Sequence, residues 1–256
     1  MSSEARKLID PLSSASLHLG LFANDTLLGT ATGFVVQHNQ KPFLVTNWHV
    51  LAGRHPDTYQ ALAQTGALPD EVRMMHHWGE HLGGRMAKSE PLFDAEGKHF
   101  WLEHPLGREI DVVALPLTSL DKGVVLYPLN LDLANHFAVP WIGLPVSIIG
   151  FPLGLTSEMD FPIWKTGHIA SEFEVDYKGK PVFLVDATTR SGMSGSPVVL
   201  RLYGGCHENV GGQLIYWGAK GAVTRFLGVY AGRIHNQAEV GYVWKPRVIT
   251  EILAQR

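Results

Sequence analysis

TRSGMSGSPVV, residues 189–199, is the stretch that decides the interpretation of this chain, because it surrounds one serine with glycines. Gly192 lies two positions before Ser194, and Gly195 follows it directly. Glycine permits a tight turn that aims successive backbone N–H groups at one point, and such groups stabilise the oxyanion of acyl transfer. Ser194 is therefore a candidate nucleophile, although the segment alone also fits an ordinary glycine–serine turn between strands.

Two further segments supply the groups that a serine nucleophile needs. FLVTNWHV, residues 43–50, places His49 after an apolar strand, and EIDVVALPL, residues 109–117, places Asp111 at the start of another. Each segment is a weak signal by itself. Together they give the chain order His, Asp, Ser, which chymotrypsin-like enzymes use and subtilisin-like and α/β-hydrolase enzymes do not.

The α/β-hydrolase alternative is disfavoured on two further grounds. The nucleophile elbow G-x-S-x-G is not met, because Gly195 follows Ser194 directly. Short β-rich runs punctuated by turns, without alternating helices, predict an all-β fold. The predicted strands are residues 16–22, 27–37, 42–46, 110–117, 146–150, 164–171, 182–186, 196–202, 226–232 and 241–244, and residues 246–256 close the chain as a helix. Residues 52–109 are expected to form long surface loops with about two strands.

Composition narrows the function classes. The 256 residues are 45% hydrophobic and carry a net charge of −3, which gives a sizeable core and no basic face for nucleic acid. The lone cysteine, Cys206 in a Gly-Gly-Cys-His turn, is expected to be a free surface thiol and excludes an internal disulfide. It favours a reducing compartment, the cytoplasm, as does an N-terminus without the apolar core of a secretory signal. Residues 137–155 are uncharged, but their prolines and glycines predict two strands with turns rather than a membrane helix.

The chain resembles trypsin-like serine peptidases, in particular the bacterial peptidase domains related to the high-temperature-requirement proteases. The resemblance covers residues 15–256, with 52–109 poorly matched. The segments that carry it are GTATGFVV, TNWHV, IDVVALPL, IGFPLGLTSE followed by TGHIAS, GMSGSPVV and GYVWKPRVITEIL.

The resemblance implies two antiparallel six-stranded β-barrels and a C-terminal helix. Residues 1–125 would form the first barrel, with 52–109 as a long insertion, and residues 126–256 the second barrel and the helix. Together they would make one peptidase domain, without the PDZ domain that many of these proteases carry.

The resemblance also implies roles for single residues. Ser194 would attack the scissile carbonyl, His49 would act as general base and then acid, and Asp111 would orient the imidazole. The N–H groups of Gly192 and Ser194 would form the oxyanion hole. The strand at residues 226–232 would pair with the substrate backbone. The residues expected to bind substrate are Thr188, Tyr230, Ala231, Gly232 and Gly241.

Several positions depart from the family pattern. Met193 stands where digestive trypsins have the aspartate that captures a new N-terminus, so activation by zymogen cleavage is not expected. Ser196 replaces a second glycine and crowds the turn. Thr188 stands near the position of the acidic pocket residue of trypsin, and Arg190 adds positive charge. A small or medium apolar residue is therefore expected before the scissile bond.

No metal or organic cofactor is expected. His76, His77, Glu80, His81, His99 and His104 make a histidine-rich region, but H-E-x-x-H is absent and glycines interrupt the helix that a zinc pair would need. The expected partners are a protein or peptide substrate and an activating protein, which would release an oxyanion turn held inactive by residues 52–109 or 153–163. Neither nucleic acid nor membrane is expected. The alternatives are a catalytically inert protease-fold module that binds peptides or a partner protein, and a zinc-regulated scaffold.

Overall fold

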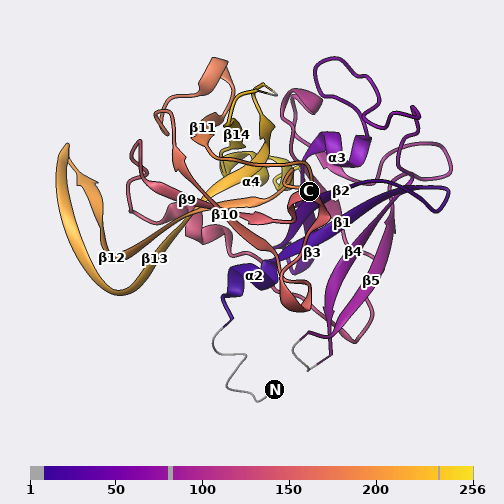
Figure 1. Ribbon diagram of the computed structural model, residues 1–256, viewed down its shortest axis with the longest axis horizontal. Coiled ribbons are helices and arrows are strands. Elements are labelled where there is room, and N and C mark those ends of the chain that lie inside the picture. Colours follow the sequence, from indigo (N-terminus) through magenta and orange to yellow (C-terminus); the bar gives the residue numbers. More distant parts are fainter. Residues whose placement is uncertain (1–8, 80–82, 236, 256) are drawn as a thin grey trace.

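Two antiparallel β-sheets make up the molecule (Figure 1), which we describe from a computed structural model for residues 9–79, 83–235 and 237–255. The first sheet has eight strands, ordered β5-β4-β1-β2-β3-β7-β6 with β8 paired to β4. Its strands are β1 (Ser16–Ala23), β2 (Thr26–His38), β3 (Lys41–Thr46), β4 (Glu71–Trp78), β5 (Arg85–Pro91), β6 (Leu102–Glu103), β7 (Val113–Pro116) and β8 (Val124–Val125).

The second sheet closes into a six-stranded barrel in the order β10-β11-β14-β13-β12-β9. Its strands are β9 (Pro145–Gly150), β10 (Ile163–Ile169), β11 (Val182–Asp186), β12 (Pro197–Val210), β13 (Gln213–Arg233) and β14 (Val240–Trp244). The predicted all-β fold is confirmed, and the second sheet is the expected six-stranded barrel, whereas the first sheet has eight strands rather than the six expected. The first sheet differs in detail: among the described residues it does not close, because β4 and β5 extend it beyond β1.

Helices are short and lie between or after the strands. The α-helices are α2 (Pro11–Ala15), α3 (Trp48–Ala52) and α4 (Arg247–Leu253), and the 3-10 helices are η1 (Gly107–Glu109), η2 (Leu131–Asn135), η3 (Pro152–Gly154), η4 (Glu158–Asp160) and η5 (Tyr177–Gly179). The helical spacing of the last residues correctly predicted α4. Among the described residues, no helix is both long and apolar enough to cross a membrane; residues 137–155 contain β9 and η3 instead of the two strands expected.

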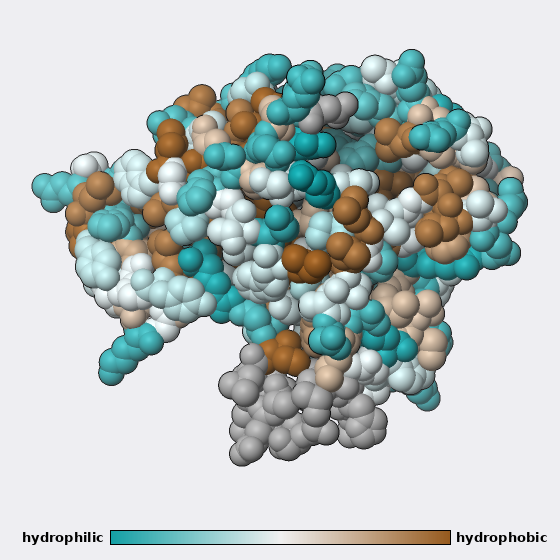
Figure 2. Space-filling view, in the orientation of Figure 1, coloured by the Kyte–Doolittle hydropathy of each residue, from teal (hydrophilic) through white to brown (hydrophobic). Residues whose placement is uncertain are grey.

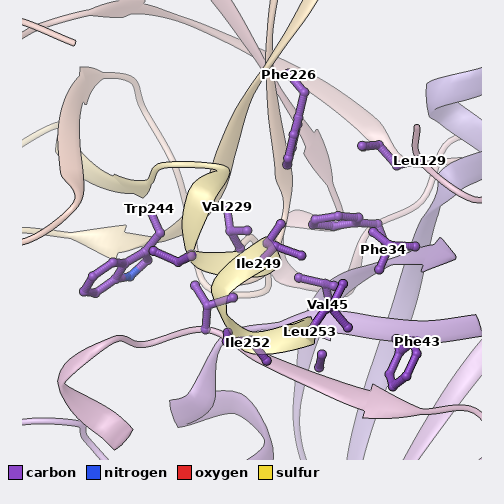
Figure 3. Close-up of a cluster of buried hydrophobic side chains, with 14 of the residues drawn as sticks. Phe34, Phe43, Val45, Leu129, Phe226, Val229, Trp244, Ile249, Ile252 and Leu253 are labelled. Carbon is purple, nitrogen blue, oxygen red and sulfur yellow. The ribbon is translucent and has the colours of Figure 1, made fainter. Parts of the chain in front are cut away.

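The sheets share a core that α4 completes (Figure 3). Phe34 and Phe43 enter it from the first sheet, Trp244 from the second, and Ile249 and Ile252 from the helix. All five side chains are buried, and each fully buried apolar side chain contributes roughly 1.5–3 kcal/mol. This shared core fixes the two sheets against each other and so fixes the cleft between them.

Strand β2 faces two cores at once because successive side chains of a strand point to opposite faces. Ala31 and Val35 pack inside the first sheet, whereas Phe34 and Val36 pack into the shared core. Its run of buried residues, Ala31 to Val36, reflects this double burial. Thr32 has the parity of Phe34 and Val36, so its side chain faces the second sheet.

Two regions depart from the sequence-based expectation. Residues 52–109 contain β4 and β5, and β4 pairs with β1 as an integral strand of the first sheet. Strands β12 and β13 extend past their neighbours into a long hairpin arm that projects from the barrel (Figure 1). On this arm apolar side chains lie among polar ones (Figure 2). Cys206 lies in β12 and is only 2% exposed, so the expectation of a surface thiol is wrong.

Candidate active site

His49 is presented by α3, which starts two residues after strand β3 ends. The loop before Asp111 is attached to this point, because the side-chain amide of Asn47 donates to the Asp111 carbonyl oxygen at 2.7 Å. Gly53 adopts φ +62 and ends the helix. Asp111 itself lies two residues before β7, which begins at Val113 rather than at residue 110 as the apolar run predicted.

The Asp111 carboxylate makes two hydrogen bonds to His49. Its Oδ2 lies 2.7 Å from His49 Nδ1, and its Oδ1 accepts from the His49 backbone N–H at 2.9 Å. Because a carboxylate only accepts, Nδ1 carries the hydrogen, and Nε2 is left as a proton acceptor. The Asp111 side chain is 7% exposed and that of His49 is 17% exposed, so the pair is shielded while the imidazole reaches solvent.

The serine turn depends on two glycines. Gly192 has φ +92 and Gly195 has φ +86, values that residues with a Cβ rarely adopt. Space is the second constraint. A Cβ at Gly192 would overlap the carbonyl oxygen of Phe151, and one at Gly195 would overlap that of Thr32. The two glycines that the sequence singled out are thus required by both backbone conformation and packing.

Thr32 connects this turn to the first sheet. Its backbone N–H donates to the Ser194 carbonyl at 2.9 Å, and its hydroxyl donates to the Gly192 carbonyl at 2.8 Å. The same hydroxyl accepts from the Phe151 N–H at 3.1 Å. Thr32 is fully buried. Sequence reasoning missed this residue, whose only signal is its place in the GTATGFVV segment.

Two further backbone hydrogen bonds hold the turn. Leu153 donates its N–H to the Ser191 carbonyl at 2.6 Å, and Gly195 donates to the Tyr230 carbonyl at 2.8 Å. Within the described ranges, no hydrogen bond uses the backbone N–H of Gly192 or of Ser194. These two donors are therefore available to a negative oxygen, as an oxyanion hole requires.

The Ser194 hydroxyl and His49 line one pocket. In this conformation the hydroxyl donates to the Ala231 carbonyl at 3.1 Å, and the described residues include no hydrogen bond between it and His49. Catalytic hydrogen bonds are often unformed without substrate.

The residues expected to bind substrate lie on neighbouring strands. Tyr230, Ala231 and Gly232 are on β13, and Gly241 is on β14. The Tyr230 ring is 1% exposed and is packed so closely over Gly241 that an added Cβ there would lie 2.5 Å from the ring. Thr188 is exposed.

Thr189, the residue after Thr188, contacts the Tyr230 side chain. Thr189 is buried and its hydroxyl is hydrogen bonded to that of Tyr230. The Tyr230 side chain therefore contacts both Gly241 and the residue next to Thr188. Burial raises the pKa of Tyr230, so the phenol stays protonated and neutral.

The histidine-rich region does not gather into a metal site within the described part of the chain. His76 and His77 are buried in β4, whereas Glu80 and His81 lie outside the described residues. His99 stacks on Trp101, and His104 bonds Glu251 at 2.8 Å.

Comparisons with known proteins place these features in a family. Residues 31–204 match the model of the trypsin-like peptidase domain, whereas no curated protein matches the chain significantly. The fold is similar to that of a serine endoprotease from Yersinia pestis, with 14% identity and a TM-score of 0.54, over 95% of this chain and 62% of that one. It is also similar to the Rv3671c protease from M. tuberculosis in its active form, with 18% identity and a TM-score of 0.52, over 95% and 81% of the two chains.

Proposed function

Since the chain belongs to the trypsin-like peptidase family and is a trypsin-like serine protease, we propose that it is an endopeptidase whose catalytic residues are His49, Asp111 and Ser194. One observation carries the proposal. An imidazole fixed by a buried carboxylate shares a pocket with a serine whose turn presents two unused N–H groups.

The proposed reaction begins when Ser194 Oγ turns from the Ala231 carbonyl to His49 Nε2, loses its proton there and attacks the scissile carbonyl carbon. The carbonyl oxygen becomes an oxyanion that accepts from the Gly192 and Ser194 N–H groups. His49 then gives the proton to the leaving amine, the C–N bond breaks, and an acyl-enzyme remains. Water, deprotonated by His49, hydrolyses the ester. Asp111 keeps the hydrogen on Nδ1 throughout and stabilises the imidazolium.

The substrate backbone is proposed to pair with β13 at Ala231 and Gly232, as an added strand. The side chain before the scissile bond would then point to the space between Thr188 and Gly241. The Tyr230 ring packs over Gly241 and its hydroxyl bonds that of Thr189, so it narrows that space, and Arg190 and Arg233 lie near Glu239 at 3.6 and 4.0 Å. These contacts support a small apolar residue before the scissile bond and disfavour lysine or arginine.

Control by a partner is proposed in place of zymogen cleavage. Met193 is fully buried in the core of the second barrel, so an ion pair with a new N-terminus has no acceptor there. The turn instead contacts the loop after β9, through Leu153, and that loop is held at Met159 by Arg85 of β5 at 3.0 Å. A protein that moves β5 would act on the oxyanion turn through these contacts. The single buried cysteine supports a reducing compartment, the cytoplasm of a bacterium.

The rival proposal is an inert module that binds peptides. Two observations favour it: the Ser194 hydroxyl is bonded to Ala231, and the buried Ser196 hydroxyl has no partner within the described residues. Hydrolysis of an unfolded protein by the wild type and by Ser194→Ala, with circular dichroism as the folding control, separates the two. We expect cleavage by the wild type only. Equal release of fragments by both proteins would indicate a contaminant and remove the support for Ser194.

A further inference from the structure

An open pocket of about 240 Å³ lies beside Ser194, and Tyr230 is not among its lining residues. Its walls come from three parts of the chain. Strands β1 and β2 contribute Leu21, Leu28 and residues 29–31, the segment after α3 contributes Gly53, Leu62, Ala63, Ala67 and Pro69, and the active site contributes His49, Val50, Ser191, Gly192 and Ser194.

The direction of the reaction assigns this pocket to one side of the scissile bond. The acyl part of the substrate stays on Ser194 next to β13 and β14, where Ala231 and Gly241 lie. The pocket contains no residue of β13 or β14. It does contain His49, which gives its proton to the leaving amine. The pocket therefore faces the residue that follows the scissile bond.

The lining determines which side chain fits. No lysine, arginine, aspartate or glutamate is among the lining residues, which are mainly leucine, alanine, valine, glycine and proline. A dry apolar cavity of about 150 Å³ is large enough for benzene. A pocket of about 240 Å³ with these walls accommodates a leucine or phenylalanine side chain, and none of its lining residues offers a carboxylate or an ammonium group to pair with a charged side chain.

The outer wall is an ordered structure and not a loose loop. Leu62 donates its backbone N–H to the Gly53 carbonyl at 2.8 Å, and Arg54 pairs with Ala61 as an isolated β-bridge. Gly53 is packed so closely on Pro69 that a Cβ would overlap the proline ring. The Leu62 side chain is 50% exposed, so one face reaches solvent and the other lines the pocket.

We infer that this protease selects substrates mainly on the leaving-group side, by a large apolar residue directly after the scissile bond that occupies the pocket between β2 and residues 53–69. The inference rests on the proposed endopeptidase function. It complements the space narrowed by Tyr230, which leaves little room for selection before the bond.

The test uses internally quenched peptides with alanine before the scissile bond and leucine, phenylalanine, aspartate or lysine after it. We expect kcat/KM for leucine and phenylalanine to exceed that for aspartate and lysine by about 100-fold, in the range that apolar pockets provide. Leu62→Asp should lower the leucine-to-lysine ratio by at least tenfold. Leu106→Asp, at a leucine that is 60% exposed and outside the pocket, should leave the ratio unchanged.

A p-nitrophenyl ester of acetyl-alanine separates failure of this inference from failure of the proposed function, because it has no residue after the scissile bond. Ester hydrolysis that Ser194→Ala abolishes, with equal cleavage of all four peptides, would overturn the inference and leave the endopeptidase proposal standing. An unchanged leucine-to-lysine ratio in Leu62→Asp would also overturn it. Absence of both ester and peptide hydrolysis would overturn both proposals.

Discussion

The two halves of the active site are constructed differently. His49 and Asp111 both belong to the first sheet's part of the chain and are joined by two direct hydrogen bonds, at 2.7 and 2.9 Å. Ser194 belongs to the second sheet's part, and its turn is held in place by Thr32 from the first sheet, by Tyr230 from the second, and by Leu153 from the loop after β9.

The geometry of the His49–Asp111 pair is determined within the first sheet, whereas the position of the serine turn depends on how the two sheets pack against each other. The histidine–aspartate pair is complete as it stands. The serine hydroxyl is bonded to Ala231, and its approach to His49 depends on how the sheets meet. Control by a partner therefore has an obvious target in the serine half, whereas the other half is already in place.

The largest expected effect comes from a substitution in the half of the active site formed by His49 and Asp111. Asp111→Asn keeps an oxygen for the His49 backbone N–H but presents an amide to Nδ1, which favours the wrong tautomer. We expect kcat/KM on a peptide substrate to fall about 10³–10⁴-fold. The melting temperature should change by only a few degrees, because the side-chain size is kept. A fall of less than tenfold would show that Asp111 does not orient the base.

The second effect breaks the serine half. Gly192→Ala adds a Cβ that overlaps the Phe151 carbonyl, so the turn must move and one oxyanion donor is lost. Loss of such a donor costs about 10²–10³ in kcat. Gly143→Ala is the matched control, since Gly143 has φ +82 with open space around it. Equal activity of the two variants would contradict the assigned oxyanion hole.

A third variant sharpens the comparison by cutting the connection between the halves. Thr32→Val keeps the shape but removes the hydroxyl that donates to the Gly192 carbonyl and accepts from Phe151. Leaving these groups unpaired costs about 1–3 kcal/mol each, and we expect kcat to fall about 10–100-fold while KM changes little. Thr32→Ser should restore most of the rate.

The control for that variant lies one hydrogen bond away. Thr46 donates its hydroxyl to the Thr32 carbonyl at 2.8 Å and lies against Gly195, but it is not hydrogen bonded to the serine turn. Thr46→Val should therefore destabilise the protein with a smaller effect on kcat. A larger kcat effect at Thr46 than at Thr32 would remove Thr32 from its positioning role.

The smallest effect on activity is expected far from both halves. His76 is fully buried in β4, neither ring nitrogen has a hydrogen-bond partner within the described residues, and burial lowers its pKa to about 4. Because the folded pKa lies below the unfolded one, its stabilising contribution is present above about pH 6.5 and is lost as pH falls toward 4.

Urea unfolding at pH 7 and pH 4.5 measures this contribution. The wild type should lose about 2 kcal/mol more than His76→Leu between the two pH values. His168→Leu, at an exposed histidine of β10, should behave as the wild type does. Activity at pH 7 should be the same in all three proteins. If His76→Leu loses as much unfolding free energy between pH 7 and pH 4.5 as the wild type does, the acid sensitivity belongs to other groups.

The sequence predicted those parts of the candidate site that are marked by characteristic residue types within a short segment. Glycines beside Ser194 and apolar runs beside His49 and Asp111 are visible in short segments, and the structure brings His49 and Asp111 into contact. Thr32 and Phe151 were not predictable, because Thr32 acts on residues 119 and 160 positions away and one of its partners is a backbone carbonyl. Every residue has a backbone carbonyl, so no sequence pattern reveals which one the Thr32 hydroxyl binds.

The hairpin arm was missed for a different reason. The sequence predicted a turn at Gly204, Gly205 and Cys206 between separate strands at 196–202 and 226–232, whereas the structure uses the two glycines at a break in the register of β12 and has Gly211 and Gly212 at the hairpin turn. The position of strand β4 was also not predicted, because histidines and charged residues obscure its alternation of buried and more exposed side chains. Glycine content alone did not distinguish a loop from a bent strand.

The central claim is that Ser194 is an activated nucleophile, and labelling with a fluorescent fluorophosphonate tests it most directly. The probe needs no substrate specificity, because it reacts with the serine itself. We predict that the wild type is labelled, that Ser194→Ala is not, and that Asp111→Asn is labelled far more slowly. Equal labelling of the wild type and Ser194→Ala, or no labelling of either in purified form and in lysate from the source cells, would contradict the claim.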